Sequence, residues 1–193
     1  LQTGYISLGP VIVNANVAAM NVDGYIYNIL NSFYHTCLTF CSQNFGAKRF
    51  DRVKKVFFVG TGTVTALGLV LGLFVYTFAE PLVGIFNSDP EILVYAKQRL
   101  ALVALPYFLC GLMDVGSGFL RSIGYSFRAL IITFLGSCVL RIVWVYTVFP
   151  IFNDVRALYA VFPVSWFITA ATLFVMFFLC YKKEKKMLLN PLK

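Results

Sequence analysis

Long runs of uncharged residues constrain this sequence more than any other feature. Two runs carry no charged residue, a third is interrupted only by Asp114, and a fourth only by Arg141. In chain order these runs are Val56–Ala79, Leu100–Leu120, Ala129–Phe149 and Leu158–Tyr181. A helix of about 20 apolar residues crosses the hydrocarbon core of a bilayer, and each run reaches that length. The runs therefore predict an all-α polytopic membrane protein.

A further span is expected at Val11–Phe45, which is longer and more polar than the others. This gives five complete transmembrane helices. Leu1–Gly9 is interpreted as the end of a sixth helix, followed by a turn at Gly9-Pro10. Because the sequence opens in mid-pattern and without a methionine, we interpret it as a fragment whose N-terminal portion is missing.

The basic residues are concentrated in short segments between the apolar runs. Most of the 16 lysines and arginines fall on one side of the predicted membrane. They are Lys48, Arg49, Arg52, Lys54, Lys55, Arg121, Arg128, Lys182, Lys183, Lys185, Lys186 and Lys193. Lys97, Arg99 and Arg156 are assigned to the opposite side. The bias predicts that the basic side and the C-terminus are cytoplasmic, and it argues against a nucleic-acid partner despite the net charge of +8.

No catalytic or metal-binding motif is present. The five cysteines lie within apolar runs, without CxxC spacing and without histidine partners. The single histidine, His35, has no carboxylate at metal-ligand spacing, and no HExxH, GxSxG or phosphate loop occurs. We therefore predict that the protein is not an enzyme and has no catalytic residue, no metal site and no cofactor.

A polar stripe runs along the Val11–Phe45 span. Asn14, Asn21, Asn28 and His35 recur at intervals of seven, and Asn31 lies close to the same face. Such a stripe is costly against lipid, so it is expected to face protein or water. These five residues are predicted to line a cavity. The alternative is that they only hydrogen-bond neighbouring helices together.

Asp114 is the leading candidate for binding a cation or a proton. A carboxylate within the bilayer costs at least about 2.5 kcal/mol, so its presence suggests a function. The adjacent glycines, including Gly111, Gly116 and Gly118, are expected to leave room for water or an ion. The alternative is a structural ion pair with Arg141. Asp23, nearer the outer end of its span, is expected to be solvated, to pack between helices or to assist coupling.

Several segments resemble the multidrug and toxic compound extrusion (MATE) family. FCSQNFGAKRFDRVKK resembles the signature and basic loop that follow the eighth helix of these transporters. The following segments of the chain resemble later parts of bacterial members: SDPEILVYAKQRL, LPYFLCGLMDVGSGFLRSIGYS and GSCVLRIVWVYTVF. The resemblance covers almost the whole chain. It implies two six-helix lobes around a central cavity, and it places Asp114 on the tenth helix, where one subgroup carries an acidic residue that helps bind the coupling cation.

The resemblance divides the chain into three parts. Residues 1–9 would end the seventh helix, residues 10–181 would form the C-terminal transmembrane lobe, and residues 182–193 would form a basic cytoplasmic tail. The partner lobe would be the missing N-terminal half of the same protein.

The function implied is that of a secondary antiporter in the bacterial inner membrane. It would export amphipathic or cationic drugs or metabolites across the lipid bilayer in exchange for H⁺ or Na⁺. One alternative is a lipid-linked oligosaccharide flippase of the same broader superfamily. A flippase groove has to bind a pyrophosphate, so it should be lined by several lysines and arginines. Here Arg141 is the one basic residue within a span, which argues against a flippase. The other alternative is a non-transporting membrane scaffold, for which the polar stripe and Asp114 serve no purpose.

Overall fold

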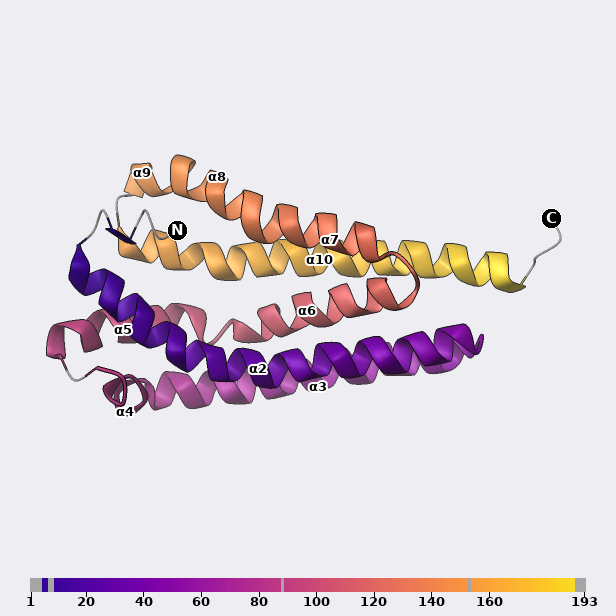
Figure 1. Cartoon of the computed structure of the whole chain (residues 1–193), viewed down its shortest axis with the longest axis horizontal. Helices are drawn as coiled ribbons and strands as arrows, with labels where there is room; N and C mark the ends of the chain where they lie inside the picture. Colours follow the sequence, from indigo (N-terminus) through magenta and orange to yellow (C-terminus); the bar gives the residue numbers. More distant parts are fainter. Residues whose placement is uncertain (1–4, 7–8, 88, 153, 190–193) are drawn as a thin grey trace.

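The computed structural model describes residues 5–6, 9–87, 89–152 and 154–189 of the chain, and this part contains helices and no β-strand (Figure 1). Most elements belong to five long rods: α2, α3, the pair α5–α6, the series α7–η1–α8–α9, and α10. The bounds are α2 Pro10–Gly46, α3 Phe50–Thr77, α4 Ala79–Gly84, α5 Pro90–Val103, α6 Tyr107–Ser122, α7 Ser126–Phe134, the π-helix η1 Leu135–Val139, α8 Leu140–Thr147, α9 Phe149–Phe152 and α10 Val155–Leu189.

Length and composition identify the rods that can cross a membrane. Phe50–Thr77, Ser126–Phe152 and Val155–Leu188 are each long and apolar enough, and the bent pair α5–α6 provides a fourth candidate among the described residues. α2 is longer than any of these, with 37 residues, but its polar side chains keep it out of this group. The predicted all-α polytopic fold is confirmed, with α2 as the least lipid-like rod.

The rod formed by α5 and α6 is sharply bent. Asp89 caps its start by accepting a hydrogen bond from the backbone N–H of Glu91 at 3.0 Å, and Pro90 occupies the first helical turn. Pro106 has no N–H with which to continue the helix. The axes of α5 and α6 differ by 51° across this break. The rod therefore begins ten residues before the predicted start at Leu100.

A proline in α10 and a π-helix between α7 and α8 are two further irregularities of the rods. Pro163 lies inside α10, which continues through it as one helix. The π-helix η1 interrupts the rod between α7 and α8, and no sequence feature predicted it. A π-bulge inserts one extra residue per turn and so changes the direction of the side chains that follow. Arg141 is the second residue of α8 and directly follows this change.

Helix α6 occupies the centre of the bundle and packs against α2, α3, α7 and α10 (Figure 1). Glycines make this close approach possible. Gly68 of α3 lies against the backbone of Phe108. A methyl group added to Gly68 would lie 2.7 Å from the Cα atom of Phe108. A methyl group on Gly111 would meet Val64 of α3 at 2.8 Å. In lipid, close packing at small residues is a main source of helix association.

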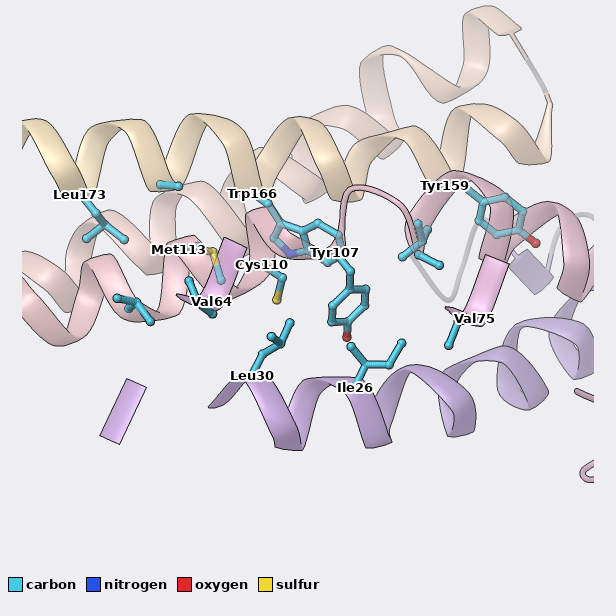
Figure 2. Packing of buried hydrophobic residues seen from close by; sticks show 14 of the residues in the cluster. Ile26, Leu30, Val64, Val75, Tyr107, Cys110, Met113, Tyr159, Trp166 and Leu173 are labelled. Atoms are coloured by element: carbon cyan, nitrogen blue, oxygen red, sulfur yellow. The ribbon is translucent and has the colours of Figure 1, made fainter. Parts of the chain in front are cut away.

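Buried aromatic side chains fill the spaces that remain around α6. Tyr107 packs edge-on against Trp166 of α10, with ring centroids 5.1 Å apart (Figure 2). Phe57 of α3 stacks on Phe177 of α10 at 5.2 Å and tilts against Phe119 of α6 at 4.9 Å. These contacts tie α3, α6 and α10 together along their length.

The basic segments all lie at one end of the bundle. The α2–α3 turn, the α6–α7 turn and the last part of α10 meet at the same end, while α4 and α9 lie at the other (Figure 1). Of the predicted helix end at residues 1–9, residues 1–4 and 7–8 are outside the described part, and Tyr5 packs on Tyr159 with centroids 6.0 Å apart. Residues 190–193 of the predicted tail are also outside it.

The α3–α6 contact predicts a difference between two glycines on one helix. Gly68→Ala places a methyl group against the Phe108 backbone, so it should destabilise the bundle by about 1–3 kcal/mol, the usual cost of overpacking. Gly62→Ala is the matched control, because Gly62 is exposed with nothing within 4 Å of the added methyl group. Thermal unfolding of both purified variants in detergent measures the difference. Equal stability of the two variants would contradict the packing described.

Candidate functional site

The polar stripe of α2 lies on the surface of this bundle. Asn14, Asn21, Asn28 and His35 are exposed, whereas Asn31 is half-buried and donates a hydrogen bond to the Tyr27 hydroxyl at 3.2 Å. Within the described residues, no side-chain hydrogen bond joins Asn14, Asn21, Asn28 or His35 to another helix. Hydrogen bonding within this bundle therefore does not account for the stripe.

Asp114 lies on α6 beside the same helix. Its carboxylate is half-buried, and its Oδ2 atom is buried without a hydrogen-bond partner among the described residues. The Asn31 side chain lies next to the carboxylate, and the positive charge of Arg121 acts on it. The described ion pairs join Lys97 to Glu80 and Arg99 to Asp23, so Asp114 does not pair with Arg141.

The glycines near Asp114 do not leave space beside it, which corrects the expectation from the sequence. A methyl group on Gly116 would meet Phe174 of α10 at 3.2 Å, and one on Gly118 would meet Tyr34 of α2 at 3.1 Å. The space beside Gly111 is occupied by the Val64 side chain, as described above. These glycines serve helix packing, and the polar neighbours of Asp114 are Asn31 of α2 and Arg121 of α6.

Asp23 is buried and paired rather than solvated. Its Oδ2 atom lies 2.6 Å from Nη1 of Arg99, and the two side chains are only 8% and 4% exposed. The Tyr107 hydroxyl also reaches the Asp23 backbone carbonyl at 3.4 Å. A buried pair of this kind is costly to break, because either partner alone becomes an unpaired charge. The pair therefore fixes α5 against α2.

Arg141 lies nearby but is held differently. Its Nε atom donates to the Ser165 hydroxyl at 3.1 Å, and its guanidinium lies 4.7 Å from the centre of the Phe162 ring. Arg99 approaches the same ring at 5.8 Å. Both contacts lie in the range of cation–π interactions. No carboxylate of the described residues lies within ion-pair distance of Arg141.

These groups border a hollow between α2, α5–α6, η1–α8 and α10. It has two adjoining parts of about 380 and 460 Å³, and both are lined by Met20, Arg99, Arg141 and Phe162. The first part also reaches Asp23, Tyr107 and Trp166, and the second reaches Asn16. Asp114 does not line it. The structure thus has two polar centres, one around Asp114 and one around the arginines, which adjoin at Tyr27, since Tyr27 lines the hollow and accepts a hydrogen bond from Asn31.

Arg99 lies within helix α5, whereas the sequence placed it in an external segment between two spans. Asp89 and Pro90 form a typical helix start, and that signal would have placed Arg99 in the third turn of a helix. Arg99 also falls on the spacing of the buried residues of α5, between Ala96 and Val103. Among the described residues, no group of three histidine, cysteine, aspartate or glutamate side chains is arranged to hold a metal ion.

Comparison with known proteins identifies the family. The model of the MatE family matches residues 3–147, about three quarters of the chain. The chain belongs to the MatE family. Members of this family are membrane transporters rather than enzymes and need no cofactor, as the sequence predicted.

Two curated relatives are similar over part of the chain. The "Probable multidrug resistance protein NorM" of Thermotoga maritima is 28% identical over 122 residues, which are 63% of this chain and 26% of that protein. The "Probable multidrug resistance protein YoeA" of Bacillus subtilis is 32% identical over 85 residues, or 44% of this chain and 18% of that protein. The matched segments span about a quarter or less of these relatives.

Solved structures share the fold. The Vibrio cholerae MATE transporter VcmN in its bent form matches 94% of this chain with a TM-score of 0.86, at 17% identity, over 41% of its own length. A MATE protein solved in complex with MaL6 matches 96% of this chain with the same TM-score, at 14% identity, over 42% of its length. The described helices therefore have the arrangement of one part of a MATE transporter, and the chain is a multi-pass membrane protein.

The Asp23–Arg99 pair predicts a non-additive response to mutation. Arg99→Met leaves a buried carboxylate unpaired and should destabilise the protein by about 3–5 kcal/mol. Adding Asp23→Leu removes that charge, so the double variant should recover most of the loss. Thermal unfolding of the single and double variants in detergent measures this coupling.

An exposed ion pair provides the control. Lys97 hydrogen-bonds to Glu80 at 2.6 Å and holds the pKa of that carboxyl below its usual value, but both side chains are more than half exposed. Lys97→Met should therefore leave the unfolding temperature almost unchanged. If Arg99→Met behaves like Lys97→Met, or if the double variant is no more stable than the single one, the pair does not fix α5 against α2.

Proposed function

We propose that the chain forms the C-terminal lobe of a secondary active antiporter. In this proposal, the antiporter exports amphipathic or cationic drugs or metabolites in exchange for H⁺ or Na⁺. The transport path runs between this lobe and an N-terminal lobe of the same protein, and the two alternate between inward and outward access. Family membership and the multidrug-resistance descriptions of both relatives support the proposal.

The exposed polar face of α2 is the observation that carries the proposal. A helix that packs on one side against α3, α5 and α6 presents asparagines and a histidine on the other. Such a face is unstable against hydrocarbon, so it requires water or another protein surface. A cavity shared with a second lobe meets that requirement, with Asn14, Asn21, Asn28, Asn31 and His35 as lining residues.

Asp114 is proposed as the residue that couples transport to the ion. A half-buried carboxylate with one unpartnered oxygen gains stability when a proton or Na⁺ occupies it. It lies next to Asn31, so its charge can influence what occupies the α2 face. Asp23 is assigned a structural role because Arg99 already neutralises it.

Two arginines, not one, bear on the flippase alternative. The sequence placed one basic residue within a span, whereas the structure places Arg99 beside Arg141 at the same hollow. The number of buried basic residues therefore does not by itself exclude a pyrophosphate ligand. Family membership and the descriptions of both relatives favour a drug antiporter. Export by the full-length protein would also exclude a non-transporting scaffold.

Orientation and location form part of the same proposal. The basic end of the bundle, with the α2–α3 turn and the end of α10, is assigned to the cytoplasm by the positive-inside rule. The protein is assigned to the inner membrane of a bacterial cell with its C-terminus in the cytoplasm.

The coupling role predicts that Asp114→Asn separates folding from transport. Asparagine keeps the size and hydrogen bonding of the side chain but removes its charge. In the full-length protein, ion-driven efflux should fall about tenfold or more, a loss typical of coupling energies, while expression and thermal stability stay close to the parent. Dye efflux from vesicles under an imposed H⁺ or Na⁺ gradient and drug resistance in an efflux-deficient host measure this.

Asp51→Asn is the matched control, because Asp51 is an exposed carboxylate in the first turn of α3. It should leave efflux unchanged. Normal efflux by Asp114→Asn would contradict the coupling role. If the unmodified full-length protein exports neither cationic nor other amphipathic compounds under an H⁺ or a Na⁺ gradient, the antiporter proposal itself is contradicted.

Orientation predicts different access to two engineered cysteines. Ile85, which is 75% exposed after α4, lies at the external end of the proposed topology, and the exposed Arg52 lies at the cytoplasmic end. In a background without native cysteines, Ile85→Cys should react with an impermeant thiol reagent added to intact cells, and Arg52→Cys should react only after lysis. The opposite pattern would reverse the orientation.

A further inference from the structure

Helices α2 and α6 pack along each other and end at the same, basic end of the bundle (Figure 1). Asn31 of α2 lies next to Asp114 of α6. One turn nearer the basic end, Tyr34 of α2 packs on Gly118 of α6. A methyl group on Gly118 would meet the Tyr34 ring at 3.1 Å and the Tyr34 carbonyl oxygen at 3.3 Å. The Tyr34 ring therefore occupies the position on α6 directly beyond Asp114.

Arg121 is held by Tyr34 and not by Asp114. It follows Asp114 by seven residues, so it lies on the same face of α6 and about 10.5 Å nearer the basic end. Its Nη1 atom donates a hydrogen bond to the Tyr34 hydroxyl at 3.3 Å, and its guanidinium carbon lies 5.9 Å from the centre of the Tyr34 ring. The described ion pairs do not include Arg121 and Asp114. The positive charge that acts on Asp114 is therefore bonded to a neutral hydroxyl.

Asp114 and Arg121 each keep one unsatisfied atom. Oδ2 of Asp114 and Nε of Arg121 are buried without a hydrogen-bond partner among the described residues. Atoms of this bundle already cover both, so a group elsewhere in the protein could reach them only if the bundle moved. Leaving a charged group incompletely bonded is costly, so both side chains gain by meeting. An arginine side chain on a helix points toward the N-terminus of that helix, which here is the direction of Asp114. Tyr34 is the side chain that lies between them.

We propose that Arg121 competes with the coupling ion for the Asp114 carboxylate, and that Tyr34 sets the balance by holding Arg121 away. While a proton or Na⁺ occupies Asp114, Arg121 stays on the Tyr34 hydroxyl. When the ion leaves, Arg121 moves past Tyr34 and neutralises the carboxylate, so the acid is not left without a positive partner. Both residues position charge and need not touch the ion. The inference rests on the proposed function, since the coupling role of Asp114 is part of it.

Titration of the Asp114 carboxyl in the purified full-length protein tests the proposal. Its infrared band, identified as the carboxyl band that Asp114→Asn lacks, is followed against pH with and without Na⁺. The midpoint measures how tightly the carboxylate holds a proton. Tyr27, Tyr107 and Cys110 also lie within electrostatic reach of Asp114, but they are ordinarily neutral at pH 7. Groups elsewhere in the protein are common to the parent and the variants, so differences between midpoints report on Tyr34 and Arg121.

The two single substitutions should act in opposite directions. Tyr34→Phe keeps the ring on Gly118 but removes the hydroxyl, so Arg121 is free to pair with Asp114. The midpoint should fall by about one pH unit, a tenfold loss of proton affinity that one hydrogen bond to a charged group can supply. Arg121→Gln removes the competitor, so the midpoint should rise. In the double variant Tyr34→Phe should have no further effect, and the midpoint should equal that of Arg121→Gln. A merely structural role of Tyr34 does not produce this dependence.

A second tyrosine–arginine contact provides the matched control. The guanidinium of Arg128 lies 4.7 Å from the centre of the Tyr125 ring, and the Tyr125 hydroxyl donates to Glu184 at 2.6 Å. This contact also lies at the basic end, but it joins α7 and α10 and does not involve α2. Tyr125→Phe and Arg128→Gln should not move the midpoint. Thermal unfolding shows whether each variant is folded, and Arg121→Met, which also lacks the charge, replaces Arg121→Gln if that variant is not.

An unchanged or higher midpoint in Tyr34→Phe would overturn the proposal, and so would a fall that persists without Arg121. A parent carboxyl that stays ionised or stays protonated throughout the titration would also overturn it, because Arg121 would then have nothing to exchange with. The result is separable from the proposed function. The expected midpoints without ion-driven efflux would leave the competition standing and remove the antiporter, while efflux with unchanged midpoints would do the reverse.

Discussion

The close approach of α6 to its neighbours is the constraint on which the rest of this structure depends. Gly68 brings α3 against the Phe108 backbone, and Gly111 and Gly116 receive side chains from α3 and α10. Since the bilayer supplies no hydrophobic force between helices, contacts of this kind must hold the lobe together. They enclose α6 on several sides, and the polar neighbours of Asp114 are Asn31 on α2 and Arg121 on α6 itself. The position of the acid is thus set by packing at glycines, not by its own hydrogen bonds.

The bend at Pro106 determines the second polar centre. A straight rod would carry α5 along the axis of α6, whereas the 51° change of direction brings Arg99 against Asp23 on α2. A buried ion pair adds little net stability but penalises every arrangement in which the partners separate. Together with Tyr107, which bonds to the Asp23 carbonyl, it fixes where α5 meets α2.

The sequence predicted the features that depend on composition. It missed those that depend on which neighbouring helix a side chain faces. Runs with no charge or a single charge identified four of the five rods, and a longer, more polar run identified α2. The predicted span at Leu100 began too late because charge, rather than the helix start at Asp89, defined its boundary, and Arg99 was assigned to a loop for that reason. The glycines near Asp114 were recognised, but one sequence does not say which neighbour fills the space at each. The π-helix at Leu135–Val139 left no recognisable pattern, so the direction of Arg141 was not predictable.

The two polar centres have a mechanical consequence under the proposed antiport cycle. Asp114 and Asn31, the groups proposed to act on the ion, lie on α6 and α2, beside the exposed polar face of α2. The groups that hold the lobe together are buried: they are the glycine contacts, the aromatic stacks and the Asp23–Arg99 pair. A rocking motion of the whole lobe can therefore change what its polar face meets without breaking an internal contact. The free-energy difference between inward and outward states then resides in the contacts between lobes and in the occupancy of Asp114, which is the arrangement that lets a bound ion select one state over the other.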